Sequence, residues 1–226
     1  AAQLAQASEH AFTESTPTML CIRGQRDNGN LHHLSGVLGH IIHDNPEVMA
    51  VTGRCADELE NELSAFIDIY RKMTASGAIP KPAEDSPTIR TAQAILGERN
   101  ASQETDYDLY LHTAQTLILD TLLQMSANKP LILVFEDASA LDLHSSQLIE
   151  SLLGSNNQIM ILLDINDRKL QQHSISVSEL TAKCQFSLNI DLLEKERMNQ
   201  LIGLLLSCEP PAWLIDWVTS QCGGKL

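Results

Sequence analysis

Aromatic side chains are scarce in this sequence: Phe, Trp and Tyr together make up 4% of its 226 residues. Hydrophobic residues still account for 43% of the chain, so the predicted core is built mainly from aliphatic side chains such as leucine and isoleucine. The charged fraction of 19% is typical of a globular protein rather than a disordered one. A chain of this length buries a sizeable core without covalent cross-links.

Basic residues are also few. Lys and Arg number 15 against 29 Asp and Glu, which gives a formal net charge of −14. A surface that binds along the phosphates of a nucleic acid usually carries more basic than acidic residues, and so does a surface that is attracted to anionic lipid. We therefore expect no direct contact of this chain with nucleic acid or membrane, and we expect the negative charge to favour solubility.

Long apolar runs and paired cysteine motifs are absent as well. No run of about 18 apolar residues predicts a membrane-spanning helix, and the N-terminal residues lack the features of a secretion signal. The five cysteines are scattered and form no C-x-x-C motif, so neither a disulfide framework nor a zinc site is expected. We interpret them as small apolar side chains in a reducing compartment, and predict a cytoplasmic protein. The chain begins without Met, so we expect a fragment of a longer protein.

Segments with strand-like and helix-like patterns alternate along the chain. Predicted strands lie at residues 18–23, 48–52, 131–135, 159–165 and 184–190. Predicted helices lie at residues 1–12, 31–42, 59–73, 106–126, 143–153, 176–183, 192–206 and 211–222, with a loop at 74–90. This alternation predicts an α/β fold with a parallel sheet. We expect an α/β domain at residues 1–190 and a helical extension, or the start of a lid domain, at 191–226. Trp213 and Trp217, four residues apart, are expected to pack within that helical part.

The loop after the first strand has the spacing G-x-x-x-x-G, from Gly24 to Gly29, and a helix follows it. Glycines in such a loop let backbone N–H groups turn toward phosphates at a helix N-terminus. The phosphate-binding motif continues with Lys and then Ser or Thr, but here those positions hold Asn30 and Leu31. An ordinary turn between strand and helix is the alternative interpretation.

The apolar strand at residues 131–135 leads directly into two acids, Glu136 and Asp137. In phosphate-loop NTPases the first acid of such a pair holds Mg²⁺ through water, and the second polarises the attacking water. The alternative is an acidic turn in which Asp137 caps the next helix.

The surroundings of the acidic pair carry a family resemblance. Residues 130–153 resemble the Walker B segment of AAA/STAND signal-transduction NTPases, the ATPase modules of large bacterial regulators of transcription and signalling. Asp142 and the helix with Leu148 and Leu152 match that segment, whereas Ala140 replaces a usual aromatic residue. Residues 51–58, with the sequence Gly-Arg-Cys, are similar to the end of the family's second strand. Residues 186–224 are similar to its closing segment.

The resemblance implies a three-layer P-loop NTPase-like fold and a set of site residues. The implied phosphate-binding residues are Gly24, Arg26, Gly29, Asn30 and Leu31; Glu136 would hold Mg²⁺ and Asp137 would lie near the attacking water. The cofactor would be ATP or ADP with Mg²⁺, although the alternative of no cofactor stays open.

Departures from the family pattern change the expected function. Besides the missing Lys and hydroxyl, Asp164 stands at the position of a polar sensor residue, and Arg168 follows two residues later than the family's Arg. Each departure weakens charge compensation for a triphosphate. We therefore expect a degenerate, catalytically impaired ATPase-like regulatory domain that acts through other domains of the same polypeptide or through protein partners.

Three further possibilities stay open on sequence alone. The first is a working ATP-dependent switch of STAND type in which Arg23 or Arg26 replaces the lysine. The second is an unrelated α/β fold. The third is self-association of the chain into a homo-oligomer, which the sequence neither predicts nor excludes.

Overall fold

Five parallel strands form one sheet in the order β2-β3-β4-β1-β5. The computed structural model describes residues 2–24, 30–55, 62–79, 88–96, 107–166, 175–190 and 195–222. The strands are β1 (Thr18–Gly24), β2 (Met49–Arg54), β3 (Leu131–Glu136), β4 (Ile159–Asn166) and β5 (Phe186–Ile190). The central strands β3 and β4 are buried along almost their whole length, which explains why their sequences are apolar on both faces.

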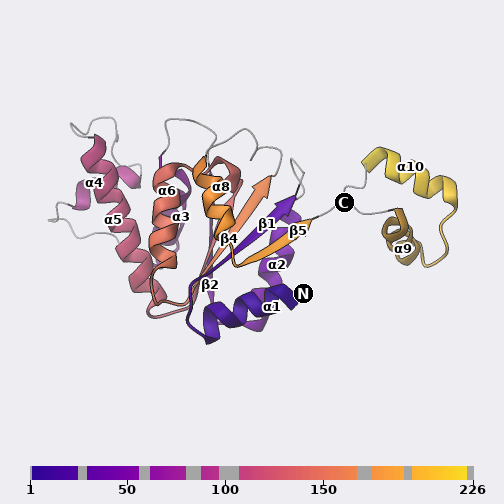
Figure 1. Cartoon of the computed structure of the whole chain (residues 1–226), viewed down its shortest axis with the longest axis horizontal. Coiled ribbons are helices and arrows are strands. Elements are labelled where there is room, and N and C mark those ends of the chain that lie inside the picture. The colour runs from indigo at the N-terminus through magenta and orange to yellow at the C-terminus, as the bar shows by residue number, and fades with distance from the viewer. Residues whose placement is uncertain are drawn as a thin grey trace.

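Helices cover both faces of the sheet and make a three-layer α/β/α sandwich (Figure 1). One face carries α1 (Ala2–Ser8), the π-helical turn η1 (Glu9–Thr13) and α2 (Asn30–Asp44). The other face carries α3 (Ser64–Ala75), α5 (Tyr107–Ser126), α6 (Leu143–Leu153) and α8 (Ile175–Ala182), with α4 (Thr88–Ile95) against α5. The predicted fold class, a P-loop-like α/β sheet, is confirmed in its architecture.

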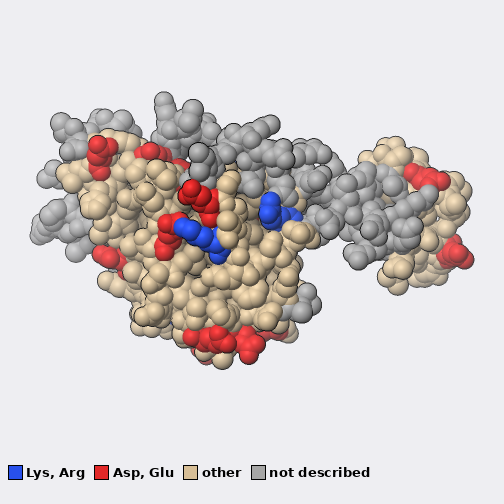
Figure 2. All heavy atoms as spheres, in the orientation of Figure 1, with Lys and Arg blue, Asp and Glu red and all other residues tan. Residues whose placement is uncertain are grey.

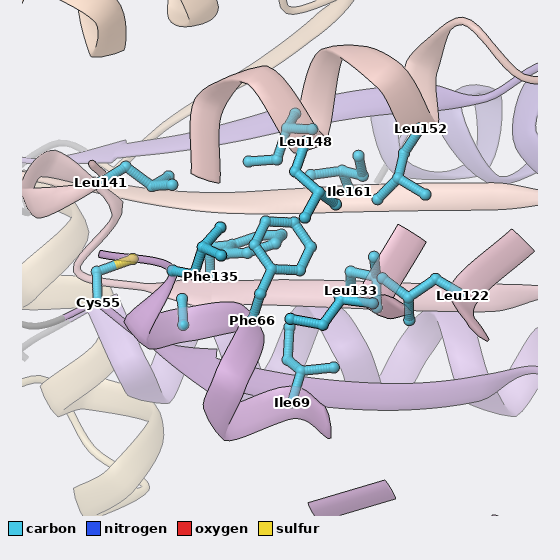
Figure 3. Packing of buried hydrophobic residues seen from close by; sticks show 14 of the residues in the cluster. Cys55, Phe66, Ile69, Leu122, Leu133, Phe135, Leu141, Leu148, Leu152 and Ile161 are labelled. Atoms are coloured by element: carbon cyan, nitrogen blue, oxygen red, sulfur yellow. The ribbon is translucent and has the colours of Figure 1, made fainter. Parts of the chain in front are cut away.

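The larger of the two cores lies between the sheet and α3, α5, α6 and α8 (Figure 3). Phe66 of α3 packs edge-to-face on Phe135 of β3, with ring centroids 5.0 Å apart and planes at 61°. Aliphatic side chains such as Leu133, Leu148 and Ile161 surround this pair, so the scarce aromatic residues lie at the centre of an aliphatic core.

The helices α9 (Lys195–Leu206) and α10 (Ala212–Cys222) pack on each other around Ile202 and Ile215 (Figure 1). Trp213 and Trp217 do not take part in that packing, because they are 68% and 58% exposed. The prediction that they pack within the helical part is therefore wrong: residues spaced by four share one face of α10, and here that face is not the one that meets α9. The domain boundary at residue 190 stays a prediction.

Element boundaries agree with the predicted ones to within about three residues in most places, and α6 agrees at both ends. Two differences occur in the region of residues 59–96. Helix α3 begins at Ser64 rather than residue 59, and α4 begins at Thr88 inside the predicted loop. Three prolines in residues 79–90 favour a loop, but all three precede Thr88. No helix among the described residues has the length and apolarity needed to cross a membrane.

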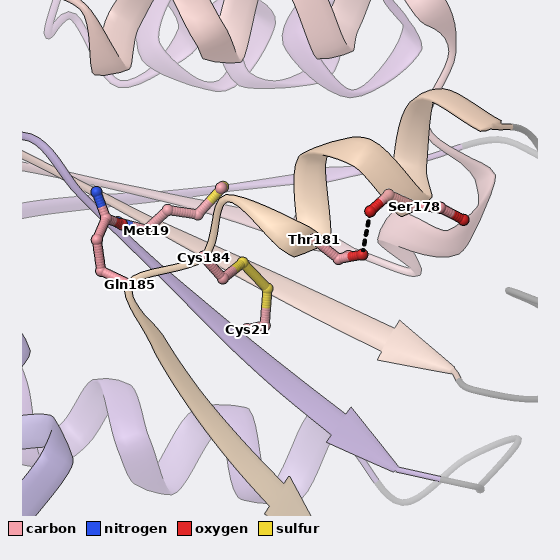
Figure 4. The surroundings of a disulfide bond; sticks show 6 residues. All are labelled: Met19, Cys21, Ser178, Thr181, Cys184 and Gln185. Carbon is pink, nitrogen blue, oxygen red and sulfur yellow. Dashed lines mark hydrogen bonds between the residues drawn. A yellow bond between two sulfur atoms is a disulfide. The ribbon is translucent and has the colours of Figure 1, made fainter.

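A disulfide bond joins Cys21 of β1 to Cys184, just before β5 (Figure 4). The prediction that the cysteines form no disulfide is therefore wrong for this pair. The two residues are 163 positions apart in sequence, and only the pairing of β1 with β5 brings them together. Cys55 and Cys208 are free thiols: Cys55 is buried, as expected of a small apolar side chain, whereas Cys208 is exposed.

Candidate functional site

The ends of β3, β4 and β1 lie side by side at the carboxyl edge of the sheet. Gly24, the last residue of β1, is in register with Asn166, the last residue of β4. On its other side β4 pairs with β3, which ends at Glu136. The candidate phosphate loop and the acidic pair therefore both start at this edge of the sheet, and β4 lies between the strands that they follow. Ligands of open α/β sheets bind at this carboxyl edge.

Glu136 and the polar residues of β4 face the side of the sheet that α2 covers. Val134, Leu162 and Ile22 belong to the core beneath α1 and α2. Side chains alternate along a strand, so Glu136, Asp164 and Asn166 share that face. Helix α2 starts at Asn30, directly after the candidate loop, and it packs on this same face. Two acidic side chains thus lie on the face of the sheet that α2 covers.

Asn166, not Asp164, is the polar residue at the end of β4. The strand continues through Asn166, and Asp164 lies inside it, 7% exposed and in register with Ile22. The expectation that Asp164 stands at the sensor position stays a prediction, and Asn166 lies on the same face of the strand, two residues nearer its end. Arg168 lies outside the described residues.

A buried hydroxyl connects the acidic turn to the end of β4. Asp137 has a left-handed backbone, with φ 56° and ψ 43°, and starts a short 3₁₀ turn, η3 (Ala138–Ala140). Within that turn Ser139 is fully buried, accepts a hydrogen bond from the Asn166 N–H at 2.9 Å and donates to the Asn166 carbonyl at 3.3 Å. The turn after β3 and the end of β4 are therefore held at a fixed separation.

Asp142, which matches the family pattern, has a structural role in this chain. Its side chain accepts hydrogen bonds from the backbone N–H of Ser145 at 2.8 Å and from that of Leu63 at 3.1 Å. The first bond caps α6, and the second fixes the residue before α3. The alternative that Asp137 caps the following helix is wrong for α6, because Asp142 is its N-cap.

Cys55, directly after β2, is a site feature that sequence reasoning missed. Its N–H donates to the Glu136 carbonyl at 3.0 Å, and Figure 3 places it at the Leu141 end of the core. Burial raises the pKa of its thiol, and the carboxylates of Asp142, Asp137, Asp164 and Glu136 raise it further. Cys55 is therefore a neutral thiol beside the acidic turn. The Gly-Arg-Cys sequence at the end of β2 was the available signal.

The candidate phosphate loop is only partly described. Gly24 ends β1, and Asn30 and Leu31 are the first residues of α2, where Lys and Ser or Thr would stand in the phosphate-binding motif. Arg26 and Gly29 lie outside the described residues, and so do the side-chain positions of Asn30 and Leu31. The proposed roles of all these residues stay predictions.

The acidic pair has the chemistry to help hold Mg²⁺ but not to hold it alone. Mg²⁺ in nucleotide sites is bound by one or two carboxylates together with substrate phosphates. Glu136 is partly exposed at the strand end and fits that role. Across the described part of the chain, no three His, Cys, Asp or Glu side chains gather as a metal site would require. A metal at Glu136 would therefore depend on phosphates for its remaining ligands.

Comparison with known proteins gives a likeness of fold. No family model matches the sequence, and no curated protein matches it. Among solved structures, the ORC2 protein of Aeropyrum pernix, in ADPNP–ADP complexes, is similar with a TM-score of 0.51 and 11% identity over 91% of this chain and 50% of that one. Cdc6p from Pyrobaculum aerophilum is similar with a TM-score of 0.50 and 14% identity over 89% of this chain and 46% of that one.

The chain has a P-loop NTPase-like fold. This result agrees with the fold that the resemblance implies. At identities of 11% and 14% the likeness concerns the fold alone. The chain also spans about half the length of these two proteins, with 50% and 46% of each covered. The carboxyl edge that carries Glu136, Asn166 and Gly24 is the place where such a fold presents its ligand site.

Proposed function

We propose that this chain is an ATPase-like regulatory module with an incomplete phosphate site, and that it acts through contacts with other domains or protein partners. The observation that carries the proposal is the start of α2. Asn30 and Leu31 occupy the positions of the lysine and hydroxyl residues that neutralise phosphates and hold Mg²⁺. Glu136, at the end of β3, is the residue that we propose for the acidic half of the site.

Electrostatics supports an impaired triphosphate site. Glu136 and Asp164 lie on the same face of the sheet as the start of α2. A nucleotide triphosphate brought to this edge would meet the Glu136 carboxylate without the lysine that normally compensates its charge. The fold then retains its architecture, and the domain is left to transmit contacts rather than to hydrolyse ATP.

The alternative function is an ATP-binding, hydrolysing switch in which an arginine replaces the lysine. Arg23 is the penultimate residue of β1, and strand alternation puts it on the face of Cys21 and Met19, which belong to the core under α3, α5, α6 and α8. That face is opposite to the one of Glu136, so Arg23 is poorly placed to compensate the phosphates. Arg26 remains the candidate for this alternative.

Isothermal titration calorimetry with ATP, with and without Mg²⁺, separates the two functions. We expect the wild-type chain to bind ATP with a Kd weaker than about 1 mM. The double variant Asn30→Lys/Leu31→Thr restores the phosphate-binding motif, and we expect it to bind at least about tenfold more tightly. Gln124→Lys adds the same charge on the exposed surface of α5 and should not change ATP binding.

Two outcomes would contradict the proposal. Micromolar ATP affinity of the wild-type chain, abolished by Glu136→Ala, would establish the ATP-dependent switch instead. If the double variant binds ATP no better than the Gln124→Lys control, the loop from Gly24 to Leu31 is an ordinary turn between strand and helix and has no relation to a phosphate site.

We propose that the partners of this chain are proteins rather than nucleic acids. Among the described residues on the face shown in Figure 2, acidic side chains outnumber basic ones, and the net charge of the whole chain is −14. Such a surface favours protein partners over nucleic acid. We propose a place in a cytoplasmic signalling or transcription-control protein, as the resemblance of residues 130–153 implies. Light scattering of the purified chain at increasing concentration tests whether one of those partners is a second copy of itself.

A further inference from the structure

The disulfide bond between Cys21 and Cys184 lies where the edge strand β5 joins the sheet (Figure 4). Cys21 is 1% exposed in the middle of β1. Cys184 is partly exposed in the short connection between α8 and β5. Cys21 is thus buried in an inner strand of the sheet, whereas Cys184 is only partly buried.

Strand β5 has few other attachments to the sheet. It is an edge strand that pairs with β1 alone, from Leu20 opposite Phe186 to Gly24 opposite Ile190. Next to the disulfide, the Gln185 side chain accepts a hydrogen bond from the Met19 N–H at 2.7 Å. The disulfide is therefore the covalent member of a small set of contacts that hold the start of β5. An edge strand held on one side only is the part of a sheet that opens most easily.

We propose that the Cys21–Cys184 pair is a redox-sensitive cross-link that controls how firmly β5, and the chain that follows it, is fixed to the sheet. In the oxidised state the start of β5 is fixed to β1. In the reduced state β5 is held by its backbone ladder, by the Gln185 contact and by the packing of Phe186 and Leu188 in the core beneath α1 and α2. This proposal does not depend on nucleotide binding.

We expect the exchange to have a defined direction, because Cys21 is buried and Cys184 is partly exposed. A low-molecular-weight thiolate of the glutathione class attacks Sγ of Cys184, which forms a mixed disulfide there. The Cys21–Cys184 bond breaks, and Cys21 leaves as a thiolate that takes up a proton in its buried position. A second thiolate then releases Cys184 and forms the oxidised small-molecule disulfide. Oxidation reverses these steps with that same disulfide as the oxidant, so atoms and electrons balance.

The first test is peptide mapping of the wild-type chain equilibrated in glutathione buffers of stepped ratio. We expect a linked peptide of Cys21 and Cys184 in the oxidising buffers and its loss in the reducing ones. At intermediate ratios we expect the glutathione adduct on Cys184 and not on Cys21. If no Cys21–Cys184 peptide forms at any ratio, or if the adduct forms on Cys21, the proposal is overturned.

The second test is amide hydrogen exchange of β5 in oxidised and reduced protein. We expect exchange of residues 186–190 to rise at least about tenfold on reduction, while residues 131–136 of the central strand β3 change little. Cys184→Ser should show the fast exchange in both buffers. Cys208→Ser removes an exposed free thiol and should behave as wild type. Equal exchange of β5 in oxidised and reduced wild-type protein would overturn the proposal, even if Cys184→Ser fails to fold.

Discussion

At the scale of single residues, Asp142 connects two parts of the chain. Its carboxylate receives the backbone N–H groups of Leu63 and Ser145 and the Ser145 hydroxyl at 2.6 Å. Leu63 is fully buried and has a left-handed backbone, with φ 62°. A buried N–H in such a turn needs a fixed acceptor, because an unpaired one costs about 1–3 kcal/mol. Asp142 therefore stabilises the start of α3 and of α6 together.

Replacement of Asp142 should be costly for that reason. We expect Asp142→Ala to lower the free energy of unfolding by about 2–3 kcal/mol, since it removes a helix cap and leaves the Leu63 N–H unpaired. Asp142→Asn keeps one acceptor oxygen and should recover part of the loss. Urea unfolding followed by circular dichroism measures both. The exposed Asp120 on α5 provides the control, and a loss from Asp142→Ala no larger than from Asp120→Ala would show that the hydrogen bonds are unimportant.

Because of Cys55, the stability of the folded chain is expected to fall at alkaline pH. Its thiol has an ordinary pKa of 9.0 in the unfolded chain, and burial and nearby carboxylates raise that pKa in the folded state. The unfolded state therefore loses its proton first as the pH rises, and the stability contributed by the protonated thiol is present below pH 9 and lost above it. The expected loss is about 1.4 kcal/mol per pH unit above that value.

A comparison of wild type with Cys55→Ala measures this effect. Stability from urea unfolding should run in parallel for the two proteins below pH 9 and diverge above it, with wild type falling more steeply. Burial also raises the pKa of Tyr70 and of Tyr107, but both proteins contain these tyrosines, so their contribution cancels. Parallel curves up to about pH 10.5 would contradict a raised pKa of Cys55.

At the scale of elements, α3 packs unusually closely on the edge strand β2. A Cβ atom at Gly53 would lie 2.3 Å from the Ala65 carbonyl oxygen and 2.8 Å from Cγ1 of Ile69. Next to this contact, Lys72 donates to the Thr52 carbonyl at 2.8 Å, and Asp68 accepts from the Arg54 N–H at 3.1 Å. Side chains of α3 thus satisfy backbone groups of the edge strand, which limits its pairing with other chains.

The close approach makes Gly53 hard to replace. We expect Gly53→Ala to lower the free energy of unfolding by about 3 kcal/mol, because the new methyl group meets backbone atoms of α3 that cannot move without displacing the helix. Gly36→Ala is the matched control: nothing lies within 4 Å of its Cβ, and it should stabilise α2 by about 0.5–1 kcal/mol. Equal effects of the two substitutions on the urea midpoint would contradict this packing.

At the scale of the whole molecule, the helices α9 and α10 form their own small core. Ile202 and Ile215 are its buried members, and Leu214 and Val218 pack against them. Among the described residues, the members of the two cores on the faces of the sheet all lie before residue 190, and none comes from α9 or α10. For this reason we propose that residues 1–190 and 191–226 are separate units.

Truncation tests that boundary. We expect a chain that ends at Ile190 to keep its thermal midpoint within about 3 °C of the full chain, since no member of the two large cores is removed. A chain that ends at Ala182 loses β5, whose Phe186 and Leu188 pack in the core beneath α1 and α2, and should be clearly less stable. A large fall in the midpoint for the longer fragment, measured by calorimetry, would place α9 and α10 in the same folding unit.

Local sequence patterns predict the strands, most of the helices and the acidic end of β3, because side-chain periodicity and turn residues act over a few positions. They predict the α/β class for the same reason. They fail at α4 and at the start of α3, where tertiary packing and the Asp142 side chain set the helix boundary. They also fail for the exposed face of Trp213 and Trp217, since periodicity identifies a helix face but not what covers it.

The sequence by itself determined which residues form strands, which acids follow β3, and that Asn30 and Leu31 follow the G-x-x-x-x-G spacing in place of the Lys and Ser or Thr of the phosphate-binding motif. Only the tertiary structure decided which distant residues meet. The strand order places Gly24, Asn166 and Glu136 at one edge, and the pairing of β1 with β5 brings Cys21 to Cys184. The physical reason is that both relations depend on contacts between residues far apart in the chain, which no local pattern of side chains encodes.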